Sequence, residues 1–177
     1  MTSLFVPFWR EYGKHLNGIV ARAIDERKPA AYVRWFPDAE SLEPYVSAWD
    51  ELAENASEPN VFLESWYLLP AMRLLRENAN LMVALVFARN GNANAEQLIG
   101  VLPLEKVRTS AGINVLRFWK HPHCFLCTPL ILAGFEAAFW EAVLRELDEQ
   151  RWEMLLQLPS MSVDGAVFEA LNRQMVA

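Results

Sequence analysis

The stretch from His121 to Cys127 gathers four side chains that could do chemistry, in the order His121-Pro-His123-Cys124-Phe-Leu-Cys127. Cysteine and histidine are the usual ligands of zinc, and a Cys-x-x-Cys pair supplies half of a four-ligand site. Paired cysteines can also cycle between dithiol and disulfide. Four ligands this close together, stiffened by Pro122, would close poorly around one ion, and the chain has no second cluster of Cys or His. A structural role is therefore favoured, with zinc and redox roles as the alternatives.

The elements that position this stretch are organised around residues 81–107, whose pattern predicts a β-hairpin at the centre of a sheet. Both faces of the first strand, residues 81–89, are apolar, so this strand must be covered on both sides. The turn, residues 90–96, is rich in Asn and Gly, which tolerate positive φ. The second strand, residues 97–107, contains Pro103, which removes a ladder donor and predicts a bulge or a local splay.

Periodicity predicts the remaining elements. Helices are expected over residues 5–27, 38–55, 65–78, 135–150 and 164–174, and strands over residues 31–36, 114–119, 129–132 and 152–158. The expected organisation is an N-terminal helical arm, residues 1–30, and one α+β domain, residues 31–177, with a mixed sheet between helices. Ser65 is a possible N-cap, and Pro70 either starts its helix or kinks it. Because the order ends in a helix, the strand 152–158 is expected at a sheet edge that a strand from elsewhere would complete.

Composition and charge narrow the class of protein. With 177 residues, 53% of them apolar, the chain can bury a core without a disulfide or a metal. The net charge of -6 argues against a nucleic-acid partner, which usually requires a basic face. Charged residues interrupt the N-terminus early, and the longest apolar run, residues 124–135, is too short to span a bilayer. We therefore expect a protein of the reducing cytoplasm, without a membrane span.

Short motifs in this domain resemble a known family. The motifs are Trp49…Leu52, Asn60-Val61-Phe62…Trp66, Leu98-Ile99-Gly100-Val101-Leu102-Pro103-Leu104 and Thr128-Pro129-Leu130. They resemble the N-terminal half of the GNAT-type acetyltransferases associated with bacterial cellulose and exopolysaccharide synthesis, which are related to the Fem-type aminoacyl transferases. The resemblance covers about residues 31 to 175. It implies a GNAT-like fold used in tandem, with the acyl-coenzyme A site in a C-terminal module that would lie outside this chain.

The resemblance also implies a substrate side for this chain. Asn60, Phe62, Trp66 and Tyr67 match the substrate-side segment of the family, where Trp and Tyr could stack on a sugar. The competing interpretation places Phe62 and Trp66 in the core. The partner implied is a second GNAT-like module or a second copy of the chain.

Acyl transfer further needs a base that deprotonates the acceptor amine or hydroxyl. His123, in a connector, and Glu105, at the end of the central strand, are the candidates. Arg108, together with Arg117 and Lys120, could bind an anionic sugar or a nucleotide-sugar phosphate. For each of these residues, a solvated or hydrogen-bonded structural role is the competing interpretation.

The cofactor site of the family is expected to be missing here. A GNAT site needs a Gln/Arg-x-x-Gly-x-Gly/Ala loop, whose backbone N–H groups hold the diphosphate at a helix N-terminus. The matching place, residues 130–137, offers one glycine, Gly134, no Arg or Lys, and the carboxylate of Glu136, which stabilises a helix start but repels a phosphate. We therefore expect a helix start there, no acetyl-coenzyme A bound by this chain, and no activity of the chain alone. The alternative is a non-catalytic GNAT module that assembles with a partner.

Overall fold

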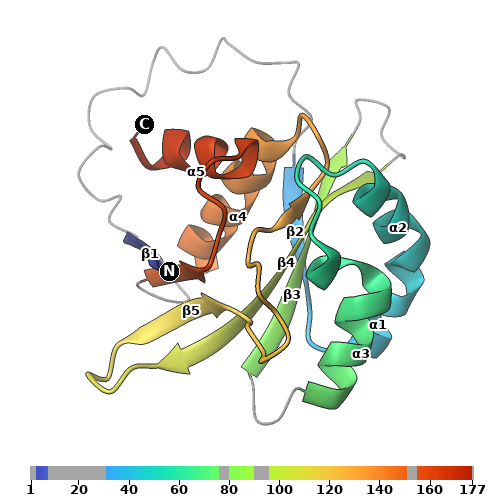
Figure 1. The fold of residues 1–177 in the computed structure, drawn as a ribbon. Helices are drawn as coiled ribbons and strands as arrows, with labels where there is room; N and C mark the ends of the chain where they lie inside the picture. The colour runs from blue at the N-terminus through green and yellow to red at the C-terminus, as the bar shows by residue number, and fades with distance from the viewer. Residues whose placement is uncertain (1–2, 8–30, 76–79, 90–95, 151–154, 177) are drawn as a thin grey trace.

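The centre of the sheet is a long antiparallel hairpin. A computed structural model describes residues 3–7, 31–75, 80–89, 96–150 and 155–176. In it, β3 (Asn80–Arg89) pairs with β4 (Glu96–Arg108) along its whole length, as predicted. Side chains of β3 are buried on both faces from Val83 to Ala88, so the hairpin needs a cover on each side. The helices in Figure 1 supply both covers.

Around this hairpin the sheet is mixed. The other strands are β1 (Ser3–Pro7), β2 (Ala31–Phe36), β5 (Asn114–Phe118), β6 (Leu130–Ile131) and β7 (Leu155–Pro159). Their order is β1-β7-β5-β4-β3-β2, and β6 pairs with β4 beside this path. Every pairing is antiparallel except the one between β5 and β7, which is parallel. The predicted α+β architecture, a central mixed sheet flanked by helices, is confirmed.

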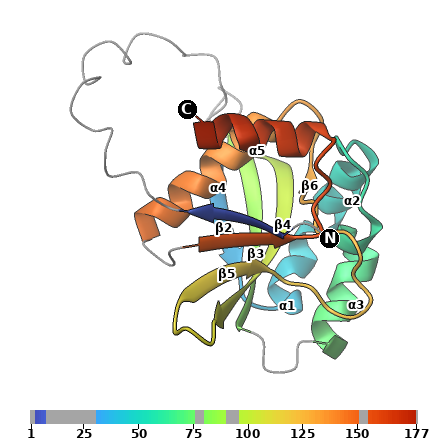
Figure 2. The same cartoon turned by 60° about the vertical axis from the view of Figure 1, so that its left-hand side comes forward.

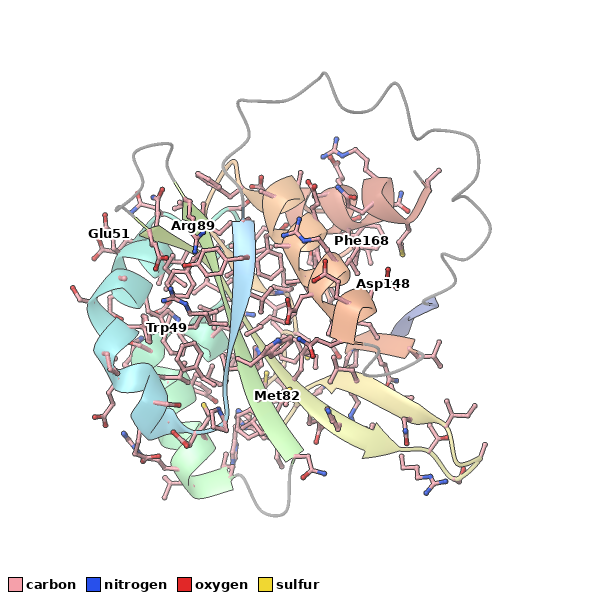
Figure 3. The ribbon with its side chains drawn as sticks, turned by 180° about the vertical axis from the view of Figure 1, so that it is seen from behind. Trp49, Glu51, Met82, Arg89, Asp148 and Phe168 are labelled. Carbon is pink, nitrogen blue, oxygen red and sulfur yellow. The ribbon has the colours of Figure 1, made fainter. Side chains whose placement is uncertain are left out.

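Two groups of helices cover the two faces of the sheet (Figure 1). One group is α1 (Ala39–Leu42), the 3-10 helix η1 (Glu43–Tyr45), α2 (Val46–Glu54), the 3-10 helix η2 (Val61–Leu63) and α3 (Ser65–Leu75); the other is α4 (Glu136–Gln150) and α5 (Ala166–Val176). Trp49 anchors the first group: its indole is fully buried between α2 and the sheet (Figure 3) and donates to the Leu63 carbonyl at 2.8 Å. Within the described ranges, no helix is long and apolar enough to cross a bilayer.

Two helices differ from their predicted forms, one in its continuity and the other in its N-terminal residues. The single helix predicted over residues 38–55 is interrupted by the 3-10 turn η1, which contains Pro44, because proline has no N–H to continue the ladder. Asp38 caps its first segment by accepting from the Ser41 N–H at 2.8 Å. Ser65 is not an N-cap, since it is the first residue of α3 and its hydroxyl donates to the Asp50 carboxylate. Pro70 lies inside α3 rather than at its start.

The start of the chain is a strand where the prediction placed a helix. Ser3–Pro7 forms β1 and pairs antiparallel with β7, from Ser3 opposite Pro159 to Pro7 opposite Leu155. The rest of that predicted helix, and most of the predicted arm over residues 1–30, lies outside the described residues. The strand that completes β7 therefore comes from the same chain, and β7 lies between β1 and β5 instead of at the edge (Figure 2).

Pro103 marks the point where β4 changes neighbour. On the side away from β3, residues Gly100 and Val101 pair with β6, whereas β5 begins its pairing at Leu104. Between the two, the Pro103 carbonyl accepts from the Trp119 N–H at 3.0 Å. The N–H and C=O of a strand residue point to the same side, so the position of the missing N–H of Pro103 also lies on this side of β4. Pairing with β3 is regular at Pro103, which lies opposite Val83, and the register shifts instead between Val86 and Phe87. What changes at Pro103 is the neighbour of β4 on its other side, where the chain leaves the sheet after Trp119.

Candidate functional site

A group of aromatic and imidazole rings lies where η2 and α3 meet the connector that follows β5, residues 119–129. We call it the aromatic–histidine cluster; its members are Phe62, Trp66, Tyr67, Trp119, His121, His123 and Phe125. Each ring contacts at least one other, so the contacts form a continuous chain. At one end, the ring centroids of Phe125 and Phe62 are 5.8 Å apart, and at the other end those of His121 and Trp119 are 5.0 Å apart. The structure thus brings together four residues that the sequence analysis selected, namely Phe62, Trp66, Tyr67 and His123.

Asn60 holds the connector against η2. Its amide is buried, and it donates to the carbonyl oxygens of Thr128 at 2.7 Å and Leu126 at 3.3 Å. Its Oδ1 accepts from the Phe62 N–H at 3.2 Å and so caps η2. Both amide hydrogens of Asn60 are therefore used within the chain. This gives Asn60, predicted as a substrate-binding residue, a positioning role in the structure.

Four members of the cluster, Trp66, Tyr67, His121 and His123, help to line a cavity of about 350 Å³. Its walls come from α3 and the connector, and the lining residues are Trp66, Tyr67, Pro70, Ala71, Leu74, Leu75, His121 and His123. Trp66 and Leu74 are 62% and 76% exposed and form the rim. Tyr67 links α3 to the connector by donating its hydroxyl to the His123 carbonyl at 2.8 Å. The volume lies at the lower end of the range for small-molecule sites.

His121 is the buried titratable group of this cavity. The residue is 6% exposed, and its ring stacks on that of Tyr67 with a centroid distance of 6.1 Å. Burial, followed by the nearby His123, lowers the pKa of His121, so the imidazole is neutral at pH 7. Its Nδ1 accepts from the His123 N–H at 3.3 Å, which assigns the single ring proton to Nε2. The sequence had placed His121 only in a metal or redox motif, because its burial depends on the fold.

Glu105 and Arg108 lie away from this cavity. Glu105, on β4, accepts two hydrogen bonds from the guanidinium of Arg117 on β5, at 3.0 and 2.8 Å. Arg108 donates to the Gly112 carbonyl at 3.2 Å in the turn between the same two strands, which project from the body of the domain (Figure 1). Neither residue lines the cavity, so the structure does not unite the two predicted bases, Glu105 and His123, at one site.

The two cysteines are buried beside the cluster. Cys124 and Cys127 are free thiols, and the Cys124 thiol donates to the Leu126 carbonyl at 3.4 Å. A hydrogen bond between the two thiols lowers the pKa of Cys124 and, together with burial, raises that of Cys127. Among the described residues, no three Cys, His, Asp or Glu side chains are placed to hold a metal ion. The zinc hypothesis therefore lacks a third ligand in this part of the chain.

A side-chain carboxylate occupies the start of α4. Gly134, with φ of 86°, donates its backbone N–H to Glu136 Oε1 at 3.1 Å. Burial alone would raise the pKa of Glu136, but hydrogen bonds from Ser57 and from the backbone N–H groups of Gly134 and Glu136, with the charge of Arg173, outweigh it and lower the pKa. The predicted helix start at residues 134–136 is confirmed. The N–H of Gly134, which a diphosphate would need here, is bound to the chain's own anion.

Comparison with known proteins gave one structural match. A solved structure described as "Crystal structure of a probable acetyltransferase" aligns with 81% of this chain and 87% of its own, with 14% sequence identity and a TM-score of 0.44. No family model matches the sequence. No curated protein matches it.

Proposed function

We propose that this chain is the substrate-side module of a GNAT-like acyltransferase, with the acetyl-coenzyme A site in a second module or a second copy. The aromatic–histidine cavity is then the place where an acceptor binds, and His123 at its edge is the candidate base. The change of neighbour along β4 at Pro103 supports this proposal, because the connector that carries both histidines leaves the sheet there, beside the cavity. A role in exopolysaccharide or cellulose metabolism follows from the sequence resemblance alone.

The position of the Glu136 carboxylate is the main support for placing the cofactor site in a second module. This carboxylate accepts the Gly134 N–H at 3.1 Å, at the start of the helix that would receive the diphosphate. A second anion would meet this negative charge at close range and find the amide already bound. An acyl-coenzyme A carrier is therefore expected to bind elsewhere.

Calorimetry with acetyl-coenzyme A tests this division. We expect no saturable heat when acetyl-coenzyme A is titrated into the purified chain, with an authentic acetyl-coenzyme A-binding protein as the positive control. The Glu136→Gln variant shows whether the charge or the shape of the loop prevents binding. Saturable binding by the wild-type chain, at a dissociation constant in the micromolar range, would place the cofactor site inside this polypeptide and overturn the proposal.

A co-expression experiment tests for the reaction itself. The chain is produced together with the polypeptide encoded directly downstream, and thiol release from acetyl-coenzyme A is measured with a candidate acceptor mixture. We expect release only when both polypeptides are present, and a loss of about 100-fold or more in His123→Ala, the size of a typical general-base contribution. Release that is unaffected by His123→Ala would remove that residue from the reaction.

A non-catalytic assembly module is the second candidate, and exposed apolar side chains favour it. Trp66, Leu74 and Phe125 are 62%, 76% and 68% exposed, although residues of this kind are usually buried. Sedimentation of the wild type and of the double variant Trp66→Ser, Phe125→Ser tests self-association. A concentration-dependent dimer that the variant abolishes supports assembly, and a monomer at all concentrations excludes association through this surface.

A further inference from the structure

His121 is buried in a state that a further proton would disrupt. Its Nδ1 accepts from the His123 N–H at 3.3 Å, and its Nε2 is buried without a partner. Protonation would add a hydrogen to Nδ1, so this acceptor would be lost and a charge with two unpaired donors would lie away from water. Buried charges and buried unpaired donors are both costly. The closed arrangement of the connector therefore disfavours the imidazolium form of His121.

The groups that surround His121 do not offset this cost. From α3, the Tyr67 ring stacks on the imidazole, and its hydroxyl is bound to the His123 carbonyl. From the connector, the His123 ring lies at a centroid distance of 6.2 Å, and Cys124 donates its backbone N–H to the His121 carbonyl at 2.9 Å. Lys120, the preceding residue, is positively charged. None of the ion pairs formed within the described ranges includes His121. Burial, followed by His123, therefore lowers the pKa of His121 without a carboxylate to oppose it.

The connector is tied to the domain at both of its ends. At the first end, the Trp119 N–H donates to the Pro103 carbonyl on β4 at 3.0 Å. At the second end, the Cys127 N–H donates to the Ser160 carbonyl at 3.2 Å, and the buried amide of Asn60 binds two further carbonyl oxygens. None of these hydrogen bonds involves a histidine. Both ends can therefore stay in place if the middle moves.

The middle of the connector, residues 120–125, is held more weakly. Within the described residues, two hydrogen bonds join this segment to the rest of the domain. One uses the His123 carbonyl and the other Nζ of Lys120, and both are exposed to water. Of the six residues, His121 and Cys124 are buried and the other four are exposed. Segments with few buried contacts and exposed hydrogen bonds are those that open locally. The buried ring of His121 is thus a main attachment of this segment.

We propose that His121 is a pH-dependent switch: when it binds a proton, residues 120–125 leave the surface of α3, while Trp119 and Cys127 stay in place. Cys124 moves with the released segment and becomes accessible, and the cavity loses the wall that the two histidines supply. An imidazole in the released segment has an ordinary pKa of about 6.5, whereas the closed form stays neutral. Binding of one proton then favours release about 10-fold more at pH 5.5 than at pH 7.5. The switch is a property of the connector and requires no acyl transfer.

Alkylation of the two buried thiols in the full chain tests the proposal. Initial rates of reaction with N-ethylmaleimide are measured at pH 7.5 and pH 5.5, and peptide mass spectrometry separates Cys124 from Cys127. Each rate is divided by that of free N-acetylcysteine at the same pH, which removes the pH dependence of the thiol itself. We expect the relative rate of Cys124 to rise about 10-fold at pH 5.5. The relative rate of Cys127 should stay constant, because its backbone remains bound to the Ser160 carbonyl.

Two variants assign the effect to His121. His121→Phe keeps a buried ring that does not titrate, so Cys124 should react at the same relative rate at both pH values. His123→Asn removes the exposed neighbour and should keep the rise. If His121→Phe does not fold, the two thiols of the wild type decide, because local release affects Cys124 alone and global unfolding affects both. A constant rate of Cys124, an equal rise of Cys127, or an unchanged rise in His121→Phe would overturn the proposal.

Discussion

Replacing Asn60 by aspartate should destabilise the domain far more than an equivalent change on its surface. Asn60→Asp keeps the size of the side chain but removes both donors, which now reach the Thr128 carbonyl at 2.7 Å and the Leu126 carbonyl at 3.3 Å. Two lost hydrogen bonds are worth about 2 kcal/mol, and buried carbonyl oxygens that face another acceptor add about 1 kcal/mol or more. We therefore expect the free energy of unfolding to fall by about 3 kcal/mol.

The matched control is Asn55→Asp. The Asn55 amide is exposed and donates to the Glu51 carbonyl at 2.8 Å, so one bond of the same kind is lost in contact with water. A new negative charge at the end of α2 is also unfavourable, but the total should stay below about 1 kcal/mol. Urea denaturation followed by tryptophan fluorescence measures both variants. For a domain of this size, 3 kcal/mol corresponds to a melting temperature lower by about 6 to 12 °C.

The result also decides between two roles of Asn60. A positioning residue loses stability on substitution, and ligand binding falls because the connector with His121 and His123 is displaced. A direct substrate ligand would lose binding while the free energy of unfolding stayed near that of wild type. Equal destabilisation by Asn60→Asp and Asn55→Asp would refute the positioning role inferred from the structure.

Three further perturbations have defined outcomes. Gly100→Ala places a Cβ into the Phe139 ring and should cost about 1 to 3 kcal/mol of unfolding free energy, measured by urea denaturation. Glu136→Gln removes a carboxylate whose pKa is lowered in the folded state. The variant should therefore lose about 1 kcal/mol of unfolding free energy relative to wild type at pH 7, and this difference should shrink as the pH falls below about 5. The pKa of His121 is lowered by burial, so the wild type loses stability as the pH falls below about 6.5, when only the unfolded chain binds the proton, and His121→Phe lacks this component of the pH dependence.

Each of these outcomes can be contradicted. A Gly100→Ala protein as stable as wild type would show that the Phe139 ring can move aside freely. A difference between wild type and Glu136→Gln that is constant from pH 7 to pH 3 would mean that the charge of Glu136 does not stabilise α4. Parallel stability profiles of wild type and His121→Phe between pH 5 and pH 8 would contradict the neutral, buried state of His121.

The centre of the fold was predictable because the signal is local. The apolar run in β3 and the turn residues after it predict a buried hairpin without knowledge of any other segment. The break of the helix at η1 could also have been predicted from the sequence, because Pro44 lacks the N–H that a continuous helix needs. The sequence also contains a signal for the ion pair between Glu105 and Arg117, which we did not use. The two residues are equally far from the turn between β4 and β5, so they lie opposite each other in the ladder.

Features that depend on distant partners could not be predicted in this way. The aromatic spacing after Phe5 matches a helix, yet Ser3–Pro7 is a strand because β7 offers it an unpaired edge. Likewise, the sequence singled out Trp66, Tyr67 and Phe62 as candidate substrate-binding residues. Their assembly into one cluster with His121 could not be predicted, because it requires the connector to fold back onto α3. The donor on Nε2 of His121 is a property of burial, and no residue type or spacing in the sequence reports it.

The pairing of β1 with β7 has a consequence for the order of folding. Ser3 lies opposite Pro159, so this ladder joins segments about 150 residues apart in the chain and is among the most non-local contacts of the domain. Contacts of this kind form slowly, because the entropy of closing a long loop must be overcome before they contribute. During synthesis on the ribosome, residues 3–7 would stay without this partner until β7 had been made. In the finished protein, amide hydrogens of this ladder should exchange with solvent sooner than those of β3 and β4.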